Sequence, residues 1–412
     1  QRPSALSGEA LFDDVIRYAG FGDHRAGTAP DRQTSEWLAD ELRESGYETE
    51  LQSWLLRQFF LKESVLKVDG KWVECFPFWY PKATGAQPVT GVLAPMTKET
   101  GPGDLEGKIA FVDGNNLGVR VISAGVNSLA EQAAAAGAVG LVVVVRSPSL
   151  EVPAINARAP YHQEPCPIPA MIVGAKNEAE LVAAAQAGTL ASIRIEGRDD
   201  TNAKAYNVIG TIKRGPKWIV VTTPTSGWFQ CAGERGPGVA LFLGLARYAA
   251  EHEGEMSYMF IANSGHELDN AGAHASLDER APGVNDVECW IHLGASIATR
   301  KWEAIEGGFK PLPEVQTNPE TRTIGHIVGT PDLLPLLQRA FKEVPGPTPR
   351  SGGPVFGELR HFIDAGYRSF GFFGGHHYFH TRLDTPATTE PEFLEAVGSA
   401  LARVISKLDA ED

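Results

Sequence analysis

The chain has 412 residues, of which 43% are hydrophobic and 21% are charged, and its formal net charge at pH 7 is −14. This length and composition predict a globular protein with two or three structural units and a large core. The negative charge favours a soluble protein and argues against nucleic acid and anionic membrane surfaces as partners. The composition does not indicate an oligomeric state.

The sequence contains no apolar run near the roughly 18 to 20 residues that cross a membrane, and its most apolar stretch is Val139–Val145. It begins at Gln1 without the basic and apolar pattern of a signal peptide. We therefore expect a cytoplasmic protein, and the alternative is a secreted or periplasmic protein whose leader has been removed. Its cysteines are too few and too scattered for a disulfide framework or a zinc cluster.

The pattern of apolar residues changes twice along the chain. Residues 8–48 are predicted to be helical, with Leu38, Leu42 and Tyr47 on one helix. Residues 62–200 contain short strand-like runs with Gly and Pro turns, and within them Leu129–Gly137 predicts a helix and Ala138–Val145 a strand.

From residue 201 onward, strand and helix patterns alternate. Trp218–Thr222 predicts a strand, and Val239–Glu251 and Pro391–Leu408 predict helices. This alternation is typical of an α/β sheet with helices on both faces.

Three segments then resemble the metal-site framework of the co-catalytic zinc aminopeptidases, the family of bacterial leucyl aminopeptidase, glutamate carboxypeptidase and the transferrin receptor ectodomain. They are Ile219–Gly238, Phe260–Ala273 and Tyr378–Pro386. The resemblance implies an α/β fold with a mixed sheet, formed by residues 1–61 and 201–412. It also implies that residues 62–200 form an inserted smaller domain of the protease-associated type, which in this family covers the catalytic cleft.

Half of the family's metal ligands are replaced in this sequence. Where the family has a His-x-Asp pair after its first strand, the chain has Pro224 and Ser226, and Glu234 stands in place of the bridging Asp. The carboxylate that follows a later strand is replaced by Gly294. One of the two zinc sites would therefore keep only Glu234, fewer than the three protein ligands that catalytic zinc normally uses.

The second zinc site keeps more of its donors. The family's Glu-Glu pair, a general base followed by a ligand, corresponds to His266 and Glu267, and the His of its His-Thr-x-x-Asp-Thr turn corresponds to His380. The resemblance thus implies that His266 occupies the catalytic-base position. A single zinc ion on Glu234, Glu267 and His380 is the alternative to a site without a cofactor.

Without a metal, the remaining side chains suggest acid/base chemistry. Glu234 and Glu267 would form a carboxyl pair in which one pKa is raised, and His266 is the predicted general acid or base. His380 and Arg235 would supply positive charge, or Arg235 would only pair with Glu234 and lock the turn.

Cys231 in the same loop is a candidate nucleophile if a histidine reaches it, or else a small packed residue. The candidates for substrate contacts are Ser226, Trp228, Arg235, His377 and Tyr378. His377 or Tyr378 would donate a hydrogen bond to a substrate oxygen. Trp228 would form an aromatic wall or pack beneath its turn.

The sequence therefore predicts a hydrolase of the aminopeptidase fold that cleaves an amide, ester, lactone or related bond of a small molecule or peptide. Catalysis would be acid/base or nucleophilic and independent of metal. Three alternatives stay open: a single-metal peptidase or amidase, a non-catalytic binding protein, and a lyase or isomerase that uses the same acid/base pair.

Overall fold

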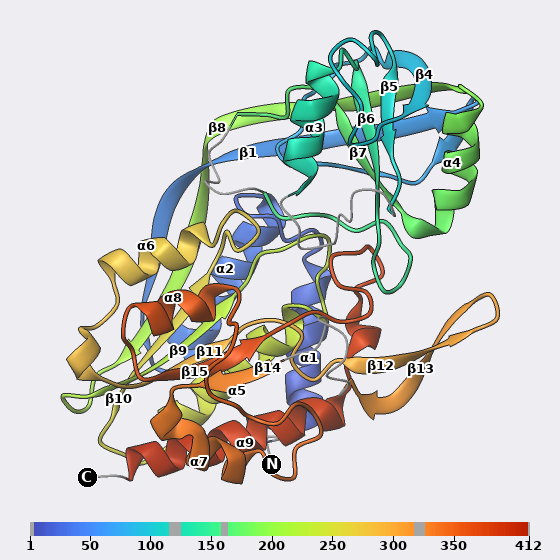
Figure 1. Ribbon diagram of the computed structural model, residues 1–412. Helices are drawn as coiled ribbons and strands as arrows, with labels where there is room; N and C mark the ends of the chain where they lie inside the picture. Colours follow the sequence, from blue (N-terminus) through green and yellow to red (C-terminus); the bar gives the residue numbers. More distant parts are fainter. Residues whose placement is uncertain (1–3, 115–124, 158–163, 317–325, 411–412) are drawn as a thin grey trace.

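The computed structural model describes residues 4–114, 125–157, 164–316 and 326–410, and it consists of a larger and a smaller part joined by a long two-stranded ribbon (Figure 1). The ribbon is formed by β1 (Glu48–Val68) and β8 (Leu190–Ile212), which pair antiparallel from Glu48 opposite Thr211 to Val68 opposite Ala191. The start of β1 and the end of β8 lie in the larger part. The end of β1 and the start of β8 carry the smaller part.

A mixed sheet forms the centre of the larger part. Its strands follow the order β14, β15, β11, β9, β10 and β8. The four strands β15, β11, β9 and β10 run parallel to one another, while β14 and β8 are antiparallel to their neighbours. The bounds are β9 Trp218–Pro224, β10 Ser257–Asn263, β11 Val287–Leu293, β14 His326–Gly329 and β15 Ser369–Phe373.

Helices cover both faces of this sheet because its strands are apolar on both sides. Ile219 and Val221 of β9 pack into the core beneath one group of helices, while Val220 points into a second cluster on the other face. The first face carries α1 (Gly8–Gly20), α2 (Ala29–Glu44), α5 (Gly236–Glu251), α7 (Leu334–Ala340) and α9 (Pro391–Asp409), and the second carries α6 (Ala271–Glu279) and α8 (Glu358–Asp364). The predicted α/β fold with helices on both faces is confirmed.

The smaller part has its own layer of strands and helices. Strands β4, β5, β6 and β7 continue the sheet from the distal half of β8, with their own core of buried aliphatic side chains such as Val142 and Ile172. The bounds are β2 Lys71–Val73, β3 Phe76–Pro77, β4 Val89–Pro95, β5 Ile109–Val112, α3 Gly125–Ala135, β6 Gly140–Val145, β7 Ala170–Gly174 and α4 Glu178–Gln186. The predicted domain boundaries, 61/62 and 200/201, fall inside β1 and β8, so the division at these residues stays a prediction.

The helices predicted at Val239–Glu251 and Pro391–Leu408 agree closely with the bounds of α5 and α9. The prediction for the N-terminal helix needs a correction. Tyr47 is not on the helix with Leu38 and Leu42, because α2 ends at Glu44 and Gly46 adopts a φ of 90°, a left-handed conformation that ends a helix. Tyr47 instead lies in the turn into β1 and donates a hydrogen bond to the carbonyl of Ala246.

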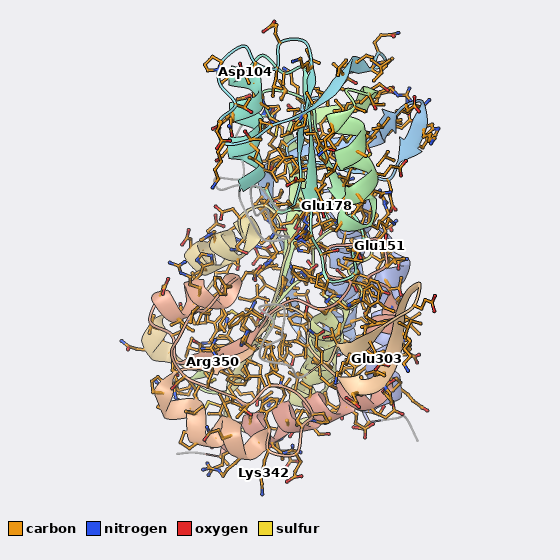
Figure 2. All side chains as sticks on the ribbon, turned by 45° about the vertical axis from the view of Figure 1, so that its right-hand side comes forward. Asp104, Glu151, Glu178, Glu303, Lys342 and Arg350 are labelled. Carbon is orange, nitrogen blue, oxygen red and sulfur yellow. The ribbon has the colours of Figure 1, made fainter. Side chains whose placement is uncertain are left out.

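A hairpin of β12 (Arg300–Ile305) and β13 (Gly308–Val315) projects from the larger part as a separate two-stranded sheet. Short 3-10 turns complete the chain at Ala175–Asn177, Val284–Asp286, Pro331–Leu333 and Pro386–Thr388. Figure 2 places Glu303 of this hairpin and Arg350 on opposite sides of the larger part. Across the described residues, no helix combines the length and apolar character needed to cross a membrane.

Candidate active site

The predicted site residues lie in the loops that follow the parallel strands, at their carboxyl ends, where α/β sheets commonly bind ligands. Several residues in these loops other than glycine hold a positive φ, including Asn270 after β10, Ser296 after β11 and His380 after β15. Such conformations are costly and persist where the surrounding structure enforces them. The loops are therefore held in fixed shapes.

Glu234 and Arg235, just before α5, form a fully buried ion pair. Arg235 Nη2 lies 2.7 Å from Glu234 Oε1, and both side chains are 1% exposed. Burial alone would raise the pKa of Glu234, but the charges of Arg235 and then His380 lower it to about 2. The pair is not fully satisfied: both Glu234 oxygens and Arg235 Nη1 lack a well-aligned hydrogen bond within the described structure.

His380 completes this cluster from the loop after β15. Its Nε2 lies 3.4 Å from Glu234 Oε1, and its Nδ1 lies 3.0 Å from the carbonyl oxygen of Ala154 in the smaller part. Because a carbonyl only accepts hydrogen bonds, Nδ1 carries a proton and Nε2 faces the carboxylate. Asp384, in the same loop, accepts hydrogen bonds from the backbone N–H groups of Gly233 and Glu234, which fixes the turn before α5.

Glu267 lies at the end of the loop after β10 with both carboxylate oxygens occupied. Oε1 accepts from the backbone N–H of Ala26 at 2.6 Å, and Oε2 accepts from the hydroxyl of Ser226 at 2.6 Å. Burial raises the pKa of Glu267, while these two hydrogen bonds act in the opposite direction. The Ser226 oxygen in turn accepts from the N–H groups of Gly265 and His266. The hydroxyl of Ser226 is thus fully used in this arrangement, and its role as a substrate contact stays a prediction.

His266 differs from Glu234, Glu267 and His380 because its side chain keeps access to solvent. It is 16% exposed, and its Nδ1 lies 3.2 Å from Oε1 of Glu358, which is 0% exposed. The amide of Asn263 donates to the other Glu358 oxygen at 3.4 Å. Burial would raise the pKa of Glu358, but the hydrogen bond from His266 and its charge lower it. The charge of His266 also lowers the pKa of Glu234, so the two belong to one electrostatic cluster.

Cys231 is buried beside this cluster, and its thiol faces Tyr18. Its side chain is 0% exposed and its Sγ lies 3.2 Å from the hydroxyl of Tyr18, which itself donates to the carbonyl of Thr225. Burial raises the pKa of the Cys231 thiol well above its ordinary value. A thiol that is buried and protonated is a poor nucleophile, so the packed interpretation of Cys231 replaces the nucleophile interpretation.

Trp228 lies under the smaller part rather than on an open wall. It is 1% exposed, its ring meets Trp79 edge to face with centroids 5.3 Å apart, and its Nε1 donates to Asn156 Oδ1 at 2.8 Å. Its aromatic surface is therefore used in joining the two parts, which is in line with the packing alternative, and its role as a substrate contact stays a prediction.

His377 and Tyr378 pack against the β12–β13 hairpin. The His377 ring lies 4.2 Å from that of Phe309, and the Tyr378 ring lies 4.8 Å from that of Trp302. Burial lowers the pKa of His377 to about 4, which keeps its ring neutral. Both residues are close to His380 in the sequence. Their predicted role in substrate binding stays a prediction.

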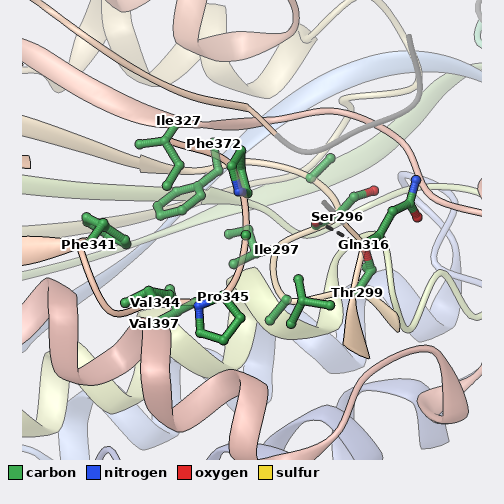
Figure 3. Close-up of a pocket in the computed structure, with 15 residues that line it drawn as sticks. Ser296, Ile297, Thr299, Gln316, Ile327, Phe341, Val344, Pro345, Phe372 and Val397 are labelled. Carbon is green, nitrogen blue, oxygen red and sulfur yellow. Dashed lines mark hydrogen bonds between the residues drawn. The ribbon is translucent and has the colours of Figure 1, made fainter. Parts of the chain in front are cut away.

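The smaller part closes the site through the segment 152–157. Besides bonding to His380, this segment donates the N–H of Ala157 to the carbonyl of Glu267 at 2.9 Å. A separate cavity of about 30 Å³ lies behind Ser296, between Phe372 and Val397 (Figure 3). It has room for only about one or two water molecules, so it is not a substrate pocket.

Comparison with solved structures identifies the fold. A zinc aminopeptidase from Bacillus subtilis aligns over 100% of this chain and 97% of its own, with 18% identity and a TM-score of 0.73. A peptidase M28 precursor from Shewanella amazonensis aligns over 99% and 95%, with 15% identity and a TM-score of 0.75. The chain has the zinc-aminopeptidase fold. Glutaminyl cyclase from Porphyromonas gingivalis also aligns, over 98% and 99%, with 12% identity and a TM-score of 0.51.

No protein-family model matches this sequence, and no curated protein sequence matches it. The identities to the aminopeptidase-fold structures lie below 20%. They show the fold of this chain and leave its activity to the chemistry of its own residues.

The donors in this site do not fit the two zinc ions that the fold suggests. A Cβ atom on Gly294 would lie 2.0 Å from the carbonyl oxygen of Phe372, so no carboxylate fits at that position. Pro224 has no donor, and the Arg235 guanidinium lies against Glu234, where a cation would otherwise bind. In the described ranges, no three His, Cys, Asp or Glu side chains gather as a metal site.

The sequence prediction missed the partner of His266. Glu358 is not among the residues that the sequence predicts for the site, and the chain separates it from His266 by 92 residues. The signal available in the sequence was a Glu at the start of a short helix near the end of the sheet. The pairing itself needed the three-dimensional arrangement of α8 beside the loop after β10.

Proposed function

We propose that this protein is a hydrolase that cleaves an amide, ester or related bond of a small molecule or peptide without zinc, with His266 as general base. One observation carries the proposal: His266 is partly exposed and is held through Nδ1 by the buried carboxylate of Glu358. With the Nδ1 proton directed at Glu358, Nε2 is the basic nitrogen. It would take a proton from the attacking water and later return it to the leaving group.

The buried cluster would stabilise the negative charge that develops on the substrate oxygen. Arg235 Nη1 has no partner among the described residues and belongs to a fixed guanidinium. A preorganised donor of this kind is worth most where water is excluded. The two carboxyl groups, Glu234 and Glu267, then act as fixed members of the charge network rather than as the acid/base pair expected from the sequence.

Access would require the segment 152–157 to move away from the loops that it contacts. Its hydrogen bonds to His380 and Glu267 involve backbone groups, which water can replace when the segment opens. A closed site that excludes water during the reaction is common among hydrolytic enzymes with mobile covers.

The test is turnover of 4-nitrophenyl acetate and other 4-nitrophenyl esters by the wild type and variants. We expect His266→Ala to lower kcat by about a hundredfold or more, because a positioned general base contributes about that factor. We expect Glu358→Gln to lower kcat by about tenfold with little change in KM, since it positions His266 without touching substrate.

His361→Ala is the matched control. His361 is a nearby half-buried histidine whose Nε2 accepts from the amide of Asn270 at 3.1 Å. We expect this variant to keep kcat within about twofold of the wild type. Full activity in His266→Ala, with no loss relative to this control, would remove His266 from the mechanism.

A further inference from the structure

A loop rich in glycine lies beside the proposed general base. Residues 352–357, called the glycine loop here, contain Gly352, Gly353 and Gly357, with φ angles of 70°, 78° and 69°. These left-handed conformations favour glycine and give the backbone a path that other residues rarely follow. The loop leads directly into α8, whose first residue is Glu358.

The glycine loop forms a wall of the space around His266. A Cβ atom on Gly357 would lie 3.4 Å from Cε1 of His266, so a side chain at this position would be in van der Waals contact with the imidazole. Arg350 fixes the other end of the loop: its guanidinium donates to the carbonyl of Gly352 and, at 3.0 Å, to that of Pro354. Both ends of the loop are thus tied to the protein.

The two apolar residues of this loop have different environments. Val355 packs against the buried cluster of Val328, Leu359 and Phe373. Phe356 points outward and is 61% exposed, and its ring contacts that of Phe373 only at an edge, with centroids 6.0 Å apart. A large aromatic side chain is therefore exposed to solvent one residue away from Gly357, which lies beside His266.

We propose that Phe356 is a specificity-determining residue, which binds a bulky apolar and preferably aromatic group of the substrate next to the bond that the water activated by His266 attacks. This inference rests on the proposed function for the role of His266. The physical reason is that an aromatic ring has only two side-chain torsions, so it loses little conformational entropy on binding, and it gains both apolar burial and an edge or stacking contact. The substrate class is accordingly an arylacetyl or similar aromatic amide or ester.

Two measurements separate the subsite from the catalytic proposal. The first is equilibrium binding of phenylacetamide and of acetamide by calorimetry, for the wild type, His266→Ala and Phe356→Ala. The second is kcat/KM for 4-nitrophenyl phenylacetate relative to 4-nitrophenyl acetate. Trp72→Ala is the control, because Trp72 is also a highly exposed aromatic residue (67%) but lies on β2 in the smaller part.

We expect the wild type and His266→Ala to bind phenylacetamide at least about tenfold more tightly than acetamide. Phe356→Ala should lose this preference for phenylacetamide, and Trp72→Ala should keep it. The aryl preference in kcat/KM should fall by a similar factor. If Phe356→Ala, with an unchanged melting temperature, binds phenylacetamide like the wild type, or if the wild type does not prefer it, the subsite is overturned. If the binding pattern holds but no ester is turned over, the subsite stands and the proposed hydrolase function fails.

Discussion

The two charged pairs of the site differ in their access to water. Glu234 and Arg235 are each 1% exposed and neutralise one another, whereas His266 keeps a partly exposed ring over the buried Glu358. A pair sealed from water serves as fixed charge, because neither partner can exchange a proton with solvent or substrate without a large cost. A ring that is open on one side and anchored on the other is arranged to transfer protons.

The largest expected effect comes from breaking the sealed pair. We expect Arg235→Met to lower the free energy of unfolding by about 3 to 5 kcal/mol, because it leaves the Glu234 carboxylate buried without its partner. The double variant Glu234→Gln/Arg235→Met should recover part of this loss, since it removes both charges. Urea denaturation measures both values, and a loss below about 1 kcal/mol in the single variant would mean that water reaches Glu234.

A second effect is the pH dependence of stability that comes from His24, which is fully buried, whereas His266 is partly exposed. Burial lowers the pKa of His24 to about 4, and its ring is 0% exposed against Tyr18. Its folded-state pKa lies below that of the unfolded chain, about 6.5, so the unfolded state binds the proton first as the pH falls. Stability is therefore lost between about pH 6.5 and pH 4, and this histidine has no such effect above that range.

We expect His24 to account for about 2 kcal/mol of the stability lost between pH 7 and pH 5. The measurement compares the free energy of unfolding of the wild type and His24→Gln at both pH values. His24→Gln should be less dependent on pH by that amount. An equal dependence in both proteins would show that the His24 ring is protonated within the fold.

The smallest expected effect is that of Cys231. We expect Cys231→Ala to keep turnover within about twofold of the wild type and to cost about 1 kcal/mol of stability, because a small packed side chain is shortened. This outcome would assign the reactive chemistry to His266 alone. A loss of about a hundredfold in turnover, with stability unchanged, would return Cys231 to the role of nucleophile.

The sequence predicted the framework better than the contacts. The strand at Trp218 and the helix that begins at Pro391 follow from local apolar periodicity, which packing on the sheet reinforces. The alternation of β9 side chains between the two faces of the sheet likewise follows from its run of apolar residues. These features depend on neighbours in sequence, and for that reason they were predictable.

The contacts that decide the chemistry join distant segments. The hydrogen bond between His380 and Ala154 spans 226 residues, and that between Ser226 and Glu267 spans 41. The family resemblance implied that Ser226 and Glu267 are polar site residues, but only their distance shows that they satisfy each other. Similarly, the burial of Cys231 depends on Tyr18 in α1, which no local pattern around the cysteine indicates.

The central claim is that this aminopeptidase fold catalyses hydrolysis without zinc, and the most direct test is metal analysis combined with an assay in chelator. Protein purified without added metal should contain well under one equivalent of zinc and should keep its turnover of 4-nitrophenyl esters in excess EDTA. Near-stoichiometric zinc whose removal abolishes turnover, with His380→Ala losing both metal and activity, would contradict the claim and establish a single-metal hydrolase.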